Sequence, residues 1–419
     1  MRRRAFLKAG GGVAAIGTLA GCTGGGDGSD DGSDGGTGSS DGGGSTATPG
    51  DGGADDPVTI GAIEPLSGNF TPWGNAHRAG LEFGVREVNQ DGGVLGRELE
   101  AEVVDTGSDP AAADSSFRRL VEQTGAVAVT GPVSSDVGIR TAQTAQDLAV
   151  PNVLHMAGSN DTITPETTYT FRLGILPAAT GMQAQARLVE DAGYSRVGAI
   201  VGDYGWGRSV EESIEAYFPA ETQIEVAPVG ADDFSVQIRK FPTDLEMMVA
   251  SGHPPGSLTI TNQLYELGYD PEVVTGAGLP PGVIAGALGE NAFKAFTHIH
   301  NTDVYGDEFA AVGRRFAEAT DGQFDTHKAY GYVTAKLLAA AIEDAGEADP
   351  DAIREALVGI EFDTLFAEPI QFSDHGELDG CVQIYSQLRE GGPEFYSSGS
   401  YHLEEQFRTE PLPALSPDD

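Results

Sequence analysis

The sequence predicts an α/β protein made of two doubly wound lobes, preceded by a long segment that cannot fold. Short β-branched runs alternate with stretches of helical periodicity from Val58 onward, and the alternation restarts after Pro177. Residues 23–56, in contrast, consist almost entirely of Gly, Ser, Asp and Thr. The chain outside this segment is too long for one small core and suits two lobes.

The first 22 residues have the pattern of an export signal. Arg3 and Arg4 precede an apolar stretch, 9–20, which is shorter than the roughly 20 residues needed to cross a bilayer. The stretch leads into Leu-Ala-Gly-Cys at 19–22, where the thiol of Cys22 would carry a lipid. We therefore expect twin-arginine export and lipid anchoring to the outer face of the cell membrane. An uncleaved N-terminal helix is the alternative.

Residues 23–56 are predicted to be a disordered tether. The segment has no aromatic and no large aliphatic residue, so it cannot bury a core. A flexible Gly-rich chain of this length has an end-to-end distance of roughly 30–35 Å. Such a tether would keep the folded body close to the membrane.

The charge balance excludes several classes of partner. The chain has 24 Lys+Arg against 64 Asp+Glu, a formal net charge of −40. This charge works against binding nucleic acid or an anionic membrane surface. It suits a halophile's protein, because a Debye length of about 3 Å at 1 M salt removes most self-repulsion. An ordinary acidic secreted protein is the alternative.

The first lobe is predicted from elements that alternate through 58–155. Val58–Ile63 is a β-branched run typical of a buried parallel strand, and helical spacing follows over 79–88. Further strands are expected at 99–104, 126–129 and 152–155, with helices around Phe117 and over 135–148.

The second series predicts another lobe of the same kind. Its expected helices are 181–192 and 207–218, and its expected strands are 197–201, 223–226, 247–249, 273–274 and 296–300. Helical stretches at 307–346 and 350–358 indicate a return to the first lobe. A ligand of two such lobes is expected at the C-terminal ends of strands, in the crevice between them.

One loop has the features of a carboxylate site. Ser134, Ser135 and Asp136 stand between a predicted strand and a predicted helix, as N-cap residues do. Free N–H groups and the positive end of the helix dipole attract a carboxylate there, and a Ser hydroxyl adds one donor. A plain helix cap without a ligand is the alternative.

Several motifs occur in an order that carries a resemblance: IGAIEPLSG at 60–68, GGVLG at 92–96, GPVSS at 131–135, DYGWG at 203–207 and DFS at 233–235. Over roughly 57–390 the chain resembles the type I periplasmic binding proteins, and more narrowly the branched-chain amino-acid (Leu/Ile/Val) binding proteins of ABC transporters.

This family has two α/β lobes joined by a multi-strand hinge. We expect lobe 1 to comprise 57–176 and 303–369, lobe 2 to comprise 177–302 and 370–410, and 411–419 to be a tail. The resemblance alone places the last strand, 381–388, in lobe 2.

The resemblance also implies site residues. Ser135 aligns with the Ser that grips the ligand's carboxylate, and Ala157 and Ser159 with positions that offer a carbonyl and a hydroxyl. Trp73 and Trp206 stand where the family carries a ligand-lining aromatic residue, so an aromatic ring from each lobe could close on an apolar ligand body. The further candidates at strand ends are Ser134, Tyr204, Gly252, His253 and Gly278.

The sequence departs from the family where the ligand's ammonium would bind. No acidic residue occurs at 276–280, where the branched-chain binders place a Glu. A buried ammonium without a carboxylate is costly. Either the ligand lacks an amine, or Asp203 or a cation–π contact with a Trp replaces the Glu.

We therefore expect an extracytoplasmic solute-binding protein, without cofactor or metal and monomeric, that delivers a small amino acid or related carboxylate to an ABC permease. A receptor for a short amide, urea or an aromatic acid is the alternative within binding. A surface α/β hydrolase using His253, or His298 with His300, is the alternative outside it. Cys381 is expected to be a buried structural thiol.

Overall fold

The computed structural model describes residues 56–219, 221–276, 278–393 and 400–414. The predicted export signal (Arg3, Arg4), the lipid-anchor Cys22 and almost all of the predicted tether lie outside these residues. None of the described helices is long and apolar enough to span a membrane.

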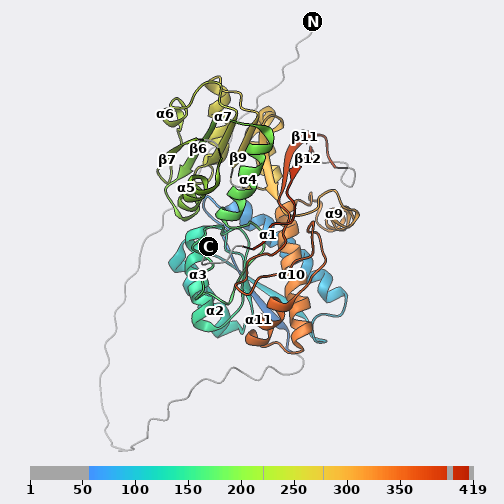
Figure 1. Ribbon diagram of the computed structural model, residues 1–419. Helices are drawn as coiled ribbons and strands as arrows, with labels where there is room; N and C mark the ends of the chain where they lie inside the picture. The colour runs from blue at the N-terminus through green and yellow to red at the C-terminus, as the bar shows by residue number, and fades with distance from the viewer. Residues whose placement is uncertain (1–55, 220, 277, 394–399, 415–419) are drawn as a thin grey trace, which may run out of the picture. The chain divides into compact units, whose positions relative to one another are not determined.

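The first lobe contains a five-stranded sheet of order β2-β1-β3-β4-β5, in which all neighbouring strands are parallel. Helices α2 and α3 lie side by side in this lobe (Figure 1). Its helices occur where the sequence predicts them, and the helix expected over 135–148 has those bounds. The elements are β1 (Val58–Glu64), α1 (Thr71–Gln90), β2 (Leu99–Asp105), α2 (Pro110–Thr124), β3 (Val129–Thr130), α3 (Ser135–Leu148), β4 (Asn152–Leu154) and β5 (Thr170–Arg172).

The second lobe contains a seven-stranded sheet of order β12-β11-β10-β9-β8-β6-β7. The strands from β10 to β7 are parallel, whereas β11 and β12 add an antiparallel hairpin at one edge. The elements are α4 (Ala178–Ala192), β6 (Val197–Gly202), α5 (Gly205–Tyr217), β7 (Thr222–Ala227), α6 (Ser235–Ile238), β8 (Met247–Ser251), α7 (Gly256–Glu266), β9 (Val273–Gly276), α8 (Pro281–Leu288), η1 (Gly289–Phe293), β10 (Phe296–His300), β11 (Ile384–Glu390) and β12 (Tyr401–Arg408).

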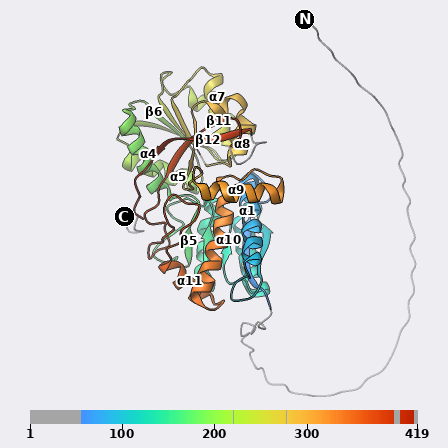
Figure 2. The ribbon, with the colours of Figure 1, turned by 90° about the vertical axis from the view of Figure 1, so that its right-hand side faces the viewer.

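After β10 the chain returns to the first lobe, as the sequence predicts. Helices α9 (Asp307–Thr320), α10 (Thr326–Ala345) and α11 (Pro350–Gly359) follow, and α10 lies beside α1 (Figure 2). The two helices pack backbone to backbone, because a Cβ added at Gly80 would lie 1.8 Å from the carbonyl oxygen of Lys328. Side chains of β1, α1 and α10 form one buried core cluster, which includes Ile60, Leu81, Val333 and Leu337.

The two sheets with covering helices confirm the predicted fold class. One segment packs differently from the expected lobe division. Ile370, Phe372 and Leu378 belong to the core cluster of the first lobe, and the N–H of Arg172 in β5 bonds the carbonyl of Gly376 at 2.8 Å. Residues 370–378 therefore pack against the first sheet, and the strands β11 and β12 extend the second. The remaining lobe boundaries stay a prediction.

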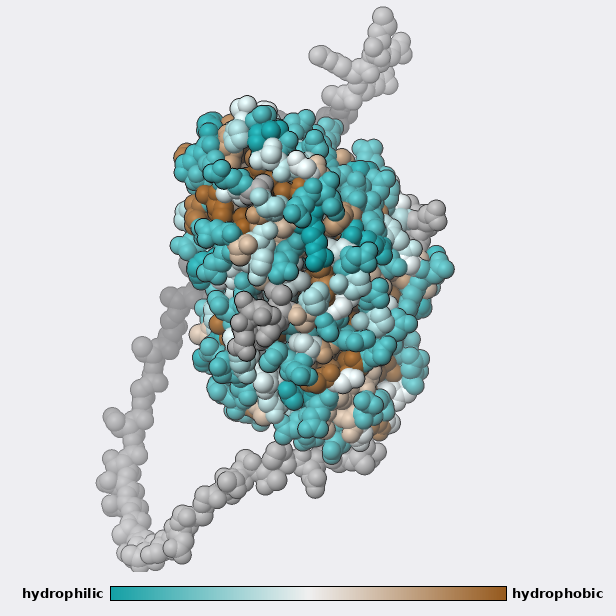
Figure 3. Space-filling model, in the orientation of Figure 1, coloured by the Kyte–Doolittle hydropathy of each residue, from teal (hydrophilic) through white to brown (hydrophobic). Residues whose placement is uncertain are grey.

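The surface agrees with the acidic composition. The face of the molecule shown in Figure 3 is mainly hydrophilic, with separate hydrophobic spots. The large apolar side chains exposed among the described residues are Tyr217, Val226, Val229, Val236 and Tyr305.

Candidate functional site

Ends of strands and helices from both lobes surround a small cavity. Its volume is ≈ 30 Å³, and a cavity needs roughly 10–15 Å³ to hold a single water molecule. Side chains of the two lobes thus nearly fill the crevice, which is the arrangement of a closed cleft. The residues that line it are Phe70, Trp73, Val133, Ser135, Met156, Ile175, Tyr204, Trp206, Pro254 and Gly278.

Trp73 connects the first lobe to the second. It lies in the first turn of α1 and is only 2% exposed. Its indole Nε1 donates a hydrogen bond to the carbonyl of Gly278, just after β9, at 2.5 Å. The centroid of its ring lies 5.6 Å from the centroid of the Phe70 ring. Both predicted residues, Trp73 and Gly278, are therefore at the cavity, with Gly278 contributing backbone.

Trp206 approaches the cavity from the second lobe. It lies in the first turn of α5, and its Nε1 donates to the hydroxyl of Ser251 at 2.7 Å. The indole also covers Gly158 of the first lobe, where an added Cβ would lie 2.5 Å from the ring carbon Cζ3. The two tryptophans thus line one cavity, each anchored through its N–H.

Ser135 is the first residue of α3, and Ser134 is its N-cap. The Ser134 side chain makes no capping hydrogen bond. Ser135 lines the cavity, and its hydroxyl accepts the N–H of Ser159 at 3.1 Å. A hydroxyl that accepts a hydrogen bond still has its own proton to donate. The start of α3 also meets the start of α5, because Asp136 Oδ1 accepts the N–H of Gly205 at 3.3 Å.

Ala157 and Ser159 lie behind the cavity and do not line it. Both are 0% exposed, and both carbonyls accept hydrogen bonds from the guanidinium of Arg172. The hydroxyl of Ser159 lies 2.9 Å from that of Ser209 on α5. In this closed arrangement both carbonyls and the Ser159 hydroxyl are therefore bonded within the protein.

Tyr204 lines the cavity, whereas Gly252 and His253 do not. The imidazole of His253 packs edge-on against the rings of Tyr204 and Phe70, with centroids 4.9 and 5.4 Å away. Burial raises the pKa of Tyr204 and lowers the pKa of His253, so both are neutral at pH 7. Gly252 packs against Ile260 and Phe234.

Among the residues that the structure describes, none of those lining the cavity is acidic. Asp203, one proposed replacement for the missing Glu, has a 67% exposed side chain that pairs with Arg208 at 3.3 Å. The described lining is apolar and aromatic apart from Ser135, the hydroxyl-bearing Tyr204 and backbone groups.

Sequence reasoning missed half of the lining: Phe70, Val133, Met156, Ile175 and Pro254. Three of them are direct neighbours of predicted residues, since Val133 precedes Ser134, Met156 precedes Ala157, and Pro254 follows His253. The sequence does not distinguish an apolar residue that lines a cavity from one that packs in the core, because both positions take the same residue types.

His298 and His300 are buried inside the second lobe and do not line the cavity. Their rings stack at 5.3 Å. His300 Nδ1 donates to the Thr302 carbonyl at 2.9 Å, and its Nε2 lies 2.9 Å from Ser386 Oγ. Burial lowers the pKa of His300 to about 4, although Glu405 acts to raise it.

The lowered pKa of His300 predicts a loss of stability in acid. Between pH 6.5 and about 4 the unfolded chain binds a proton that the folded chain does not, so stability falls as pH falls. Over this window His300 alone should cost about 3 kcal/mol. The free energy of unfolding should be measured at pH 7 and pH 4.5 for wild type and His300→Gln. It should change less between the two pH values in the variant. Equal differences would contradict the prediction.

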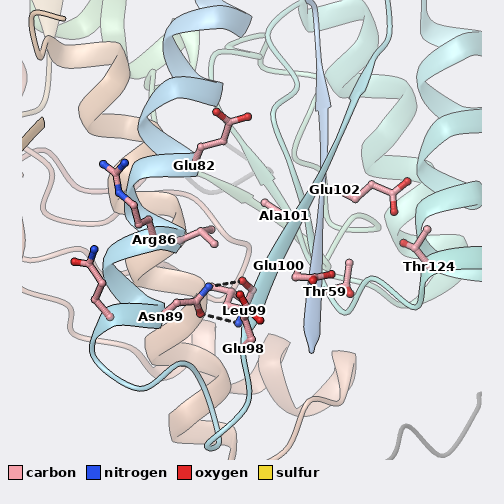
Figure 4. Close-up of a pocket in the computed structure, with 12 residues that line it drawn as sticks. Thr59, Glu82, Arg86, Asn89, Glu98, Leu99, Glu100, Ala101, Glu102 and Thr124 are labelled. Carbon is pink, nitrogen blue, oxygen red and sulfur yellow. Dashed lines mark hydrogen bonds between the residues drawn. The ribbon is translucent and has the colours of Figure 1, made fainter. Parts of the chain in front are cut away.

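A larger hollow lies along the edge strand β2 and the helix α1 (Figure 4). Its volume is ≈ 860 Å³, and its lining includes Glu82, Arg86, Glu98 and Glu102. Asn89 bonds the backbone of Leu99 across it, at 2.8 and 2.9 Å. None of the predicted site residues lines it, so the candidate site is the small interlobe cavity.

The sequence profile of the periplasmic binding proteins matches residues 57–393. The chain belongs to this family. The interpretation of the sequence as a solute-binding protein is thereby confirmed. Proteins of this kind are exported, bind small molecules and deliver them to an ABC transporter.

Individual relatives differ in what they bind. The chain is 28% identical to the Leu/Ile/Val-binding protein BraC3 of Rhizobium johnstonii, with 77% of this chain and 89% of BraC3 covered. Its fold is similar to that of LivJ of Streptococcus pneumoniae in complex with isoleucine (TM-score 0.71, 19% identity, 84% and 100% covered). It is also similar to a solute-binding protein of R. palustris in complex with benzoate (TM-score 0.69, 19% identity, 86% and 98% covered).

Proposed function

We propose that this protein captures a small carboxylate with an apolar or aromatic body between its two lobes and delivers it to an ABC permease. The observation that carries the proposal is the interlobe cavity. It combines one serine at a helix N-terminus with aromatic and aliphatic walls, and its described lining contains no acidic side chain.

The carboxylate would bind at the start of α3. Helix N-termini present free N–H groups and a positive dipole end. Ser135 lies there, and its hydroxyl proton can be donated to a ligand oxygen because the Ser159 N–H occupies only its acceptor side. No cationic side chain is needed at such a site, and the lining residues that the structure describes include neither Lys nor Arg.

The body of the ligand would lie between Trp73 and Trp206. Flat aromatic surfaces of this kind suit aliphatic and aromatic groups alike. The missing acid favours ligands without an ammonium group, because a buried ammonium would lack a partner. Aromatic acids and short amides are therefore the leading alternative to branched-chain amino acids, and the structural relatives include binders of isoleucine and of benzoate.

Transport would proceed by closure around the ligand. Hydrogen bonds between lobes, such as Trp73 to Gly278 and Gly205 to Asp136, hold the closed arrangement. The nearly filled cavity implies that the lobes separate slightly, or that the tryptophans reorient, when a ligand enters. A ligand that bridges both lobes selects the closed state, which the permease would then recognise.

The location follows from the N-terminal segment. We propose export through the Arg3-Arg4 signal, lipid attachment at Cys22 and a tether over 23–56, with a monomeric body. The supporting argument is the order of these features ahead of a family domain that begins at residue 57. Growth in labelled lipid precursor should label the wild-type chain, whereas Cys22→Ser should remain unlabelled.

Substituting Ser135→Ala should weaken binding of a carboxylate ligand by about 1.5–3 kcal/mol, the contribution of a hydrogen bond to a charged group. The matched control is Ser115→Ala, since Ser115 bonds its own helix at the Ala111 carbonyl away from the cavity. Calorimetric titration of both variants measures the difference. Equal affinity of wild type and Ser135→Ala would place the carboxylate elsewhere.

A further inference from the structure

A second group of polar side chains lies directly behind the cavity. Glu64 is the last residue of β1, His77 lies on α1 one turn after Trp73, and His155 follows β4 immediately before Met156. All three are buried, with exposed fractions of 0–1%. Trp73 and Met156 line the cavity, so this group supports the floor of the proposed ligand site.

The three side chains converge on one point. Glu64 Oε1 lies 2.6 Å from His77 Nδ1, and the rings of His77 and His155 stack with centroids 4.3 Å apart. One nitrogen or oxygen from each residue lies within 4.8 Å of the others. Buried polar atoms are almost always paired, yet Glu64 Oε2 and His155 Nδ1 have no hydrogen-bond partner in the described part of the chain.

Helix α10 holds the far sides of both imidazole rings. His155 Nε2 lies 3.0 Å from His327 Nδ1, and His77 Nε2 lies 3.5 Å from Thr334 Oγ1. Outer hydrogen bonds of this kind fix the orientation of histidines that bind metal through their other nitrogen. Gly131 provides space beside the carboxylate, since a Cβ there would lie 2.7 Å from Glu64 Oε1.

We propose that Glu64, His77 and His155 bind a divalent transition-metal ion of the Zn²⁺ type, which joins β1, α1 and the loop after β4 beneath the ligand cavity. Two imidazoles and a carboxylate form a ligand set that zinc accepts, at about 2.0–2.2 Å per bond. The unpaired second oxygen of Glu64 can take a fourth position. Because the group is closed to solvent, the ion is structural and takes no part in a reaction.

The full chain tests this directly. The chain is unfolded in the presence of a chelator and then refolded in high salt with and without ZnCl₂. Each sample is desalted, and its metal content is measured by mass spectrometry. We expect one zinc ion per chain after refolding with zinc. At free zinc 100-fold above its dissociation constant, the ratio of folded to unfolded chain should rise about 100-fold.

Two variants locate the ion. His77→Gln removes a ligand and should leave the chain without bound zinc. The matched control is His300→Gln, which replaces another buried, hydrogen-bonded histidine outside the group and should keep one zinc per chain. The absence of retained zinc in wild type, or equal retention by His77→Gln, would overturn the proposal.

A spectroscopic measurement covers the case in which His77→Gln does not fold. X-ray absorption at the cobalt edge of wild type refolded with Co²⁺ should show two imidazole ligands among nitrogen and oxygen neighbours. A shell of oxygen alone, or one that contains sulfur, would place the ion outside this group and overturn the proposal.

Discussion

Replacing Arg172 with methionine is expected to lower the free energy of unfolding by about 3–5 kcal/mol, because removing one partner leaves the other charge buried without compensation. Arg172 is 0% exposed and Glu377 is 4% exposed. The guanidinium forms two bonds with this carboxylate, from Nε at 2.8 Å and from a terminal nitrogen at 3.0 Å.

The same substitution should also weaken ligand binding. Arg172 holds the carbonyls of Ala157 and Ser159, and Ser159 in turn donates its N–H to the hydroxyl of Ser135. Loss of Arg172 therefore loosens the loop that orients the proposed carboxylate site. A displacement of about 1 Å can cost a positioned contact much of its strength.

The matched control is Arg389→Met. Arg389 bonds Glu404 at 2.6 Å, but the two side chains are 33% and 53% exposed. A pair of this kind contributes at most about 1 kcal/mol. Chemical unfolding of both variants in molar salt compares them. Similar losses for Arg172→Met and Arg389→Met would show that the buried pair has no special role.

Substituting Gly80→Ala should destabilise the first lobe by about 3 kcal/mol or more, the upper end of overpacking costs. The new methyl group would lie 1.8 Å from the carbonyl oxygen of Lys328 on α10. Backbone cannot move aside as a flexible side chain can, so α1 and α10 would have to separate. His77 and Trp73 lie on the same helix, so the proposed metal group and the cavity should be disturbed together.

The control for this prediction is Gly286→Ala on α8, where an added Cβ would meet no atom within 4 Å. Alanine is favoured over glycine in a helix, so this variant should gain about 0.5–1 kcal/mol. Thermal unfolding should show that Gly80→Ala lowers the stability of the protein and that Gly286→Ala raises it. A neutral Gly80→Ala would mean that the two helices are not in backbone contact.

The sequence alone predicted most of the helices and strands and half of the residues that line the candidate site. Helix α3 has the predicted bounds, because its start is marked by cap residues and its body by regular apolar spacing. Ser135 was predicted from its place between a strand and a helix, and Trp73 and Trp206 from the resemblance to the binding-protein family. Cap residues and sequence motifs are local features, so they can be recognised without the tertiary structure.

The buried ion pair and the proposed metal group could not be predicted, because they depend on contacts between residues that are distant in the sequence. Arg172 and Glu377 are 205 positions apart, and nothing in either local sequence indicates a pair. The sequence itself led us to expect no metal site. The structure instead brings together Glu64, His77 and His155 from three separate elements. Only the tertiary fold could reveal that convergence.

The most direct test of the binding proposal is calorimetric titration of the full chain in molar salt with matched ligands. The panel pairs each carboxylate with its amine-bearing counterpart, such as isoleucine with 3-methylpentanoate, and adds benzoate and short amides. We predict saturable binding of one ligand per chain, accompanied by a change in tryptophan fluorescence that Trp206→Phe diminishes. A folded chain that binds no amino acid, carboxylate or amide, or one whose ligand leaves both tryptophans unchanged, would contradict the account.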